Sequence, residues 1–67
     1  MKVEDFFKKN VDVDCDIELW FGTNNDNGKL LEKTSGNADG LFEPWYDMDV
    51  VYITINKDGN GIILEVA

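Results

Sequence analysis

The segment from residue 11 to residue 21 alternates strictly between two sets of side chains. One set is Asp12, Asp14, Asp16, Glu18 and Trp20, and the other is Val11, Val13, Cys15, Ile17, Leu19 and Phe21. Because successive side chains of a strand point to opposite faces, this pattern predicts one half-buried strand with an acidic outer face. Its carboxylates would recur every ~6.6 Å, which is twice the rise per residue of a strand.

The residues on either side of this strand predict a helix and a hairpin. Val3, Phe6 and Phe7 recur at helical spacing, so we expect a two-turn helix that docks its phenylalanines on the apolar face of the strand. Residues 22–28 consist of turn-forming types, and residues 29–34 predict a second strand. The lysines of that second strand are expected to face the carboxylates of the first.

The carboxyl-terminal part predicts another hairpin. Residues 50–56 and 61–67 flank a turn with Asp-Gly at its tip. We expect one row of Val51, Ile53 and Ile55 opposite a row of Ile62, Leu64 and Val66. The predicted fold is therefore a single α+β domain, residues 1–67, in which a short N-terminal helix packs on an antiparallel sheet of about four strands formed by two hairpins.

Between the hairpins, residues 35–49 carry large apolar side chains in an irregular segment, namely Leu41, Phe42, Trp45 and Tyr46. Two interpretations stand. In the one that we favour, the segment folds back over an open edge or face of the sheet and completes the core. In the other, its aromatic residues form an exposed anchor for a partner, because Trp and Tyr dominate binding hot spots.

Composition argues against several kinds of chemistry. The chain has no His, no Arg, one Ser and one Cys, so the usual nucleophile and base cannot be assembled, and we expect no enzyme activity. Cys15 is expected to be a small core residue. Residues 56–61 resemble the start of a calcium loop, but Ala67 stands where the Glu ligand is required, so we interpret them as a hairpin turn. No metal and no cofactor are expected.

The acidic balance makes a basic protein the expected partner. The formal net charge of −8 disfavours direct binding to nucleic acid or to an anionic membrane, and the acidic amino terminus predicts a cytoplasmic protein. One row of carboxylates has about half the axial charge density of a DNA strand, so a DNA mimic would need a second row. The expected partner-binding residues are Asp12, Asp14, Asp16, Glu18 and Trp20 on the first strand, Asp39, Glu43, Asp47 and Asp49 as the second row, and Trp45 and Tyr52 as aromatic anchors.

The opening Val3-Glu4-Asp5-Phe6-Phe7, the Asp-rich first strand and the closing hairpin of residues 51–66 resemble small acidic proteins of phages and mobile elements of Gram-positive bacteria. Some of these proteins are anti-CRISPR inhibitors. The resemblance implies an inhibitor in the bacterial cytoplasm that blocks the DNA-binding channel of a Cas nuclease complex. The alternative is a non-catalytic structural adaptor that uses an aromatic patch, either as a monomer or as a homodimer formed through an exposed sheet edge.

Overall fold

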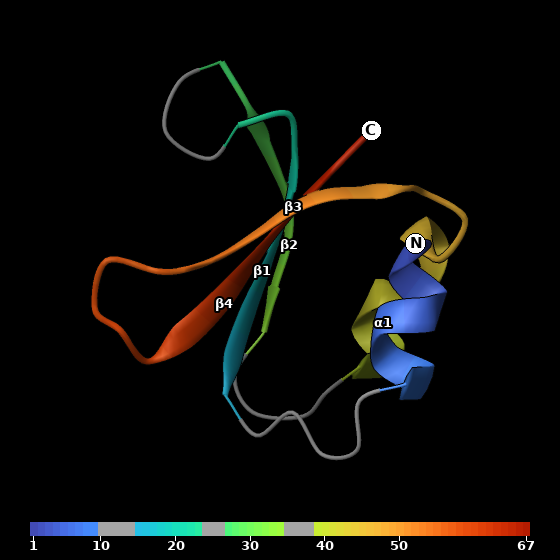
Figure 1. The fold of residues 1–67 in the computed structure, drawn as a ribbon, viewed down its shortest axis with the longest axis horizontal. Helices are drawn as coiled ribbons and strands as arrows, with labels where there is room; N and C mark the ends of the chain where they lie inside the picture. Colours follow the sequence, from blue (N-terminus) through green and yellow to red (C-terminus); the bar gives the residue numbers. More distant parts are fainter. Residues whose placement is uncertain (10–14, 24–26, 35–38) are drawn as a thin grey trace.

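The computed structural model describes residues 1–9, 15–23, 27–34 and 39–67. Two helical segments and four strands follow one another along the chain, and they are α1 (Val3–Lys9), β1 (Asp16–Phe21), β2 (Lys29–Thr34), the 3₁₀ helix η1 (Asp39–Trp45), β3 (Val50–Ile55) and β4 (Gly61–Val66). The strands form one sheet, and α1 and η1 lie together on one side of it (Figure 1). We call that side of the sheet the inner face and the opposite side the outer face. The fold is α+β, as the sequence predicts.

The sheet is mixed, with the strand order β2-β1-β4-β3. The two predicted hairpins are confirmed, because β1 pairs with β2 and β3 pairs with β4 in antiparallel fashion. The prediction of a wholly antiparallel sheet is wrong at its centre, where β1 and β4 run parallel. Turn signals specify neighbours within a hairpin only. The direction in which one hairpin meets the other depends on the long connection that contains η1, and no local pattern encodes it.

The hydrophobic core lies between the inner face and the two helical segments. Apolar residues of β1 and β4 stand side by side in register, with Ile17 beside Ile62 and Leu19 beside Leu64. The buried members of this core are Val3, Phe6, Ile17, Leu19, Phe42, Leu64 and Val66. Val3 and Phe6 of the helix are therefore buried in one cluster with Ile17 and Leu19 of β1, on the helix face that the periodicity predicts.

Helix α1 is joined to the segment after η1 by its backbone. The amide N–H of Val3 donates to the carbonyl oxygen of Met48 (2.9 Å), and that of Glu4 donates to the carbonyl oxygen of Tyr46 (3.1 Å). These bonds satisfy donors that the first turn of a helix leaves without an intrahelical partner. On the surface of the helix, Glu4 forms an ion pair with Lys8 and raises the pKa of that lysine.

The segment between the hairpins supplies a large part of the core. Phe42 of η1 is fully buried, and its ring stacks on that of Phe7 with centroids 5.0 Å apart. Trp45 and Tyr46 are partly buried against the same cluster. The interpretation in which this segment folds back and completes the core is therefore confirmed for Phe42.

A register shift at the start of β3 alters the predicted pairing of the second hairpin. Ile53 and Ile55 stand opposite Leu64 and Ile62 as predicted, but the shift lies between Val50 and Tyr52. Val50 thereby takes the place opposite Val66 that was expected for Val51, and Val51 is 60% exposed. A bulge adds one residue to one strand, so the alternation of side chains is offset beyond it.

The tip of the second hairpin is a turn, as predicted. The side-chain oxygen of Asn56 accepts the amide N–H of Asn60 (3.1 Å), and its carbonyl oxygen accepts the amide N–H of Gly59 (3.0 Å). Gly59 has a φ of 73°, which is a conformation that residues with a side chain rarely adopt.

We expect Phe42→Ala to lower the free energy of unfolding by about 3–5 kcal/mol, because it removes a buried aromatic ring from the core. Its neighbour Leu41 is 49% exposed and serves as the control, with an expected loss of under about 1 kcal/mol for Leu41→Ala. Urea unfolding followed by circular dichroism measures both values. Equal losses would contradict the assignment of Phe42 to the core.

We expect Gly59→Ala to destabilise the protein by about 1 kcal/mol, because the added Cβ is strained at positive φ. Gly40 is the matched control: a Cβ placed there meets no atom within 4 Å, so Gly40→Ala should change the stability by less than about 0.5 kcal/mol. Thermal unfolding of the two variants compares them directly. A Gly59→Ala variant as stable as Gly40→Ala would show that the turn tolerates a side chain.

Candidate functional site

The outer face of the sheet is the surface that neither helical segment covers. Two rows of side chains cross it from strand to strand. The strand registers give the rows as Lys33, Glu18, Ile63 and Thr54, followed by Leu30, Trp20, Glu65 and Tyr52. Each row thus combines acidic side chains with apolar or aromatic ones.

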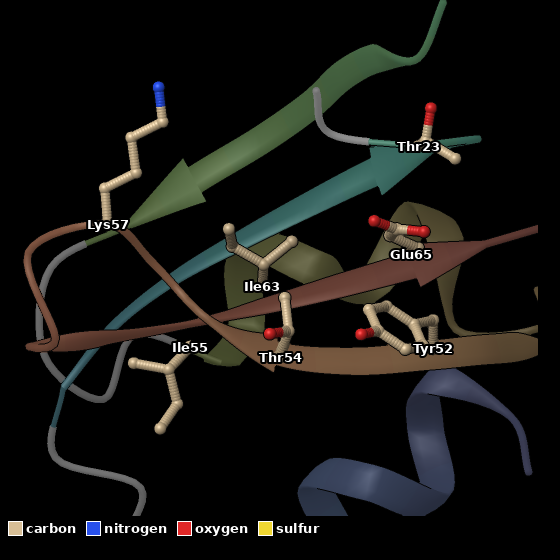
Figure 2. Close-up of a pocket in the computed structure, with 7 residues that line it drawn as sticks. All are labelled: Thr23, Tyr52, Thr54, Ile55, Lys57, Ile63 and Glu65. Atoms are coloured by element: carbon tan, nitrogen blue, oxygen red, sulfur yellow. The ribbon is translucent and has the colours of Figure 1, made fainter. Parts of the chain in front are cut away.

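Two adjoining hollows lie over this face. The larger, of about 570 Å³, is lined by residues that include Thr23, Tyr52, Ile63 and Glu65, and the smaller, of about 320 Å³, is lined by residues that include Trp20. Figure 2 shows Thr23, Ile63 and Glu65 projecting to the same side of the sheet. Ile63 lines both hollows, so they meet over β4.

The indole ring of Trp20 and the carboxylates of Glu18 and Glu65 occupy the middle of the outer face. The indole Nε1 of Trp20 donates a hydrogen bond to Oε1 of Glu18 at 2.9 Å. Glu65 is 8% exposed and stands in register between Trp20 on β1 and Tyr52 on β3. Tyr52 itself is 57% exposed. The carboxylates are thus flanked by aromatic side chains, and the hydrogen bond to Trp20 orients Glu18.

Lysines border the same surface. Lys33 stands opposite Glu18 in the β1–β2 pair, so the prediction that a lysine of the second strand faces a carboxylate is confirmed at that position. Lys29 stands opposite Phe21, so the prediction fails there. Lys57 lines both hollows and, in Figure 2, projects away from the direction taken by Ile55. The outer face is therefore acidic at its centre with lysines at its margins.

The structure separates the two predicted rows of acidic residues. Asp16 and Glu18 lie on β1 and line the smaller hollow of the outer face. Glu43 is exposed on η1, on the other side of the sheet, and Asp47 is exposed in the turn that follows η1. Asp49 forms an ion pair with Lys2 at 3.1 Å. These carboxylates do not form a second row beside β1.

The remaining predicted partner-binding residues are placed as follows. Asp12 and Asp14 lie outside the described residues, and Asp39 is the first residue of η1. Trp45 is partly buried against the core instead of being displayed as an anchor. Trp20 and Tyr52 share the outer face, on either side of Glu65, as their positions in the sequence predict.

Sequence reasoning missed three contributors to this surface, namely Ile63, Glu65 and Lys57. The alternation of Ile62, Leu64 and Val66 already assigns Ile63 and Glu65 to the opposite face. What could not be inferred is that β4 stands next to β1, which brings Glu65 beside Trp20.

Among the described residues, no group of three His, Cys, Asp or Glu side chains is placed to hold a metal ion. Cys15 is a half-buried free thiol just before β1, and is thus less buried than the core position predicted for it. The helices in the described part of the chain are too short or too polar to span a membrane.

The outer face is assembled from all four strands, which come together only in the folded chain. No protein-family model, curated protein or solved structure matches this chain.

Proposed function

We propose that this protein is a non-catalytic binding module that holds a basic segment of a partner protein on its outer face. One observation carries the proposal. The sheet face opposite the helices presents Tyr52 and Trp20 on either side of Glu65. Tyr52 and Glu65 line the hollow of about 570 Å³, and Trp20 lines the adjoining hollow of about 320 Å³. Aromatic residues next to carboxylates are the groups that recognise a lysine or arginine side chain.

The contacts available to such a side chain are specific. Its aliphatic stem would lie against the ring of Tyr52, which is 57% exposed, because long basic side chains bury their methylene groups along apolar surface. Its charged head would reach the carboxylate of Glu65 or Glu18. Cation–π attraction to an aromatic ring adds about 0.5–2 kcal/mol, depending on how far water is excluded.

The charge of the whole chain favours the same class of partner. A formal net charge of −8 on 67 residues attracts a basic protein from a distance and accelerates its association. The attraction is screened by salt, whereas the apolar contact with the ring of Tyr52 is not. Binding should therefore retain a salt-resistant component.

A basic groove that also binds nucleic acid, such as that of a Cas nuclease complex, is the partner that the family resemblance implies. In this version of the proposal the protein is an inhibitor that competes with DNA. The described carboxylates lie on both sides of the sheet, so they do not reproduce the two closely spaced rows of a duplex. We therefore propose that aromatic contacts supplement charge in holding the partner.

We expect a decalysine peptide, titrated into the isotopically labelled protein, to shift the amide resonances of the outer face. Residues 18, 20, 52 and 65 should move, and those of α1 and η1 should not. Raising NaCl from about 50 to about 500 mM should weaken the affinity by at least tenfold while the same residues still shift. Shifts spread evenly over both sides of the sheet would contradict a built site and leave only diffuse attraction by charge.

We expect Glu18→Gln to weaken binding of the same peptide by about threefold to tenfold, because the charge removed lies inside the site. Glu43→Gln is the matched control, since it makes the same change of charge on η1, on the other side of the sheet. Fluorescence anisotropy of labelled peptide measures both affinities. Equal losses for the two variants would show that net charge alone governs binding.

A further inference from the structure

Strand β3 has the composition of an interior strand but lies at an edge of the sheet. Its sequence, Val-Val-Tyr-Ile-Thr-Ile, contains no charged residue, although 30% of the chain is charged. Apolar residues on both faces are typical of a strand that is covered on both sides. Here Tyr52 on the outer face is 57% exposed, and Ile55 on the inner face is 66% exposed.

The opposite edge of the sheet is protected in the usual way. Strand β2 carries Lys29, Glu32 and Lys33 within its six residues. Charged side chains on an edge strand oppose pairing with another chain. Strand β3 has no such residue and no proline, so the two edges of this sheet differ in what they allow.

The backbone of β3 also offers free hydrogen-bonding groups along this edge. The amide of Asn56 donates to the carbonyl oxygen of Gly61, and therefore points toward β4. Because backbone groups of alternate residues point to the same neighbour, those of Ile55 and Ile53 point away from β4, toward the open edge. Each of these two residues presents one N–H and one C=O there.

The amino terminus occupies only the beginning of this edge. The amide of Val50 donates to the carbonyl oxygen of Met1 at 2.7 Å, and Lys2 forms an isolated bridge with Asp49. After Val50 comes the bulge at Val51. From there to the end of β3, no described segment pairs with the open edge of the strand. The open stretch is thus confined to the second half of β3.

We propose that β3 pairs with β3 of a second copy of this chain, in antiparallel orientation about a two-fold axis. With Ile53 opposite Ile55 of the second copy, and the reverse, every outward N–H and C=O of these residues finds a partner. Thr54 then stands opposite its own copy at the axis. The two four-stranded sheets become one sheet of eight strands.

A second copy fits this edge better than an unrelated strand for reasons of charge and symmetry. Each copy carries a formal charge of −8, and self-association survives such repulsion best along a strand that has no charge at all. Ile53 and Ile55 are 44% and 66% exposed and share the inner face at this edge. In the two-fold pair Ile53 of one copy stands beside Ile55 of the other on the same face, so the two copies cover each other's apolar side chains.

This association does not rest on the proposed function, because it uses the backbone of the β3 edge, although side chains of β3 also line the larger hollow. The two are distinguished by salt. Screening should weaken binding of a basic partner, and it should strengthen association between two copies of an acidic chain.

Sedimentation equilibrium of the intact protein, from about 10 μM to about 1 mM, tests the proposal. We expect a monomer–dimer equilibrium whose dissociation constant falls when NaCl is raised. Ile53→Lys and Ile55→Lys should each raise that constant by at least tenfold, because they place a charge on the paired edge. Leu30→Lys on β2 is the matched control, since Leu30 is 42% exposed and Ile53 is 44% exposed, and it should leave the constant within about twofold.

Two results would overturn the proposal. One is a wild-type protein that stays monomeric over the whole concentration range at high salt. The other is a Leu30→Lys variant that weakens the dimer as much as the β3 variants do. Circular dichroism confirms that each variant is folded, and because Ile55 is 66% exposed, Ile55→Lys decides the question if Ile53→Lys unfolds.

Discussion

The parallel pairing of β1 with β4 is the contact on which the rest of the structure depends. It joins two hairpins that are each specified locally, and it sets Leu19 beside Leu64 under the helices. On the other side of the sheet it sets Glu18 beside Ile63 and Trp20 beside Glu65. We call this parallel pair of β1 and β4 the seam. Without it the two hairpins would share neither a core nor an outer face.

The same seam decides which surfaces of the chain stay open. With β1 and β4 at the centre, β2 and β3 become the edges. The two helical segments cover the inner face over the seam, but Ile53 and Ile55 on the outlying strand remain exposed there. The protein thus combines an uncovered acidic and aromatic face with one unprotected edge.

Local patterns in the sequence predicted the parts of the fold that are specified locally. The helical spacing of Val3 and Phe6, the alternation of residues 16–21 and the turn at Gly59 all appear as expected. Trp20 and Tyr52 were correctly placed on one face from the alternation of side chains along each strand.

The parts that could not be predicted are those fixed by tertiary packing. The bulge at Val51 offsets the pairing of β3, and nothing in a run of β-formers marks it in advance. The separation of Glu43 from Glu18 follows from Phe42, whose burial holds η1 on the inner side of the sheet. The acidic residues that were predicted to form a second row therefore do not lie beside the carboxylates of β1.

The seam also has a consequence for the rate at which the chain folds. Ile17 and Ile62, which are neighbours in it, are separated by 62 − 17 = 45 positions along the chain. Each hairpin closes a short loop and forms quickly, whereas contacts between distant residues must first overcome the entropy of closing a long loop. We therefore expect the docking of the two hairpins to limit the folding rate, with side chains of β1 and β4 structured in the transition state and the turn at Gly59 formed beforehand.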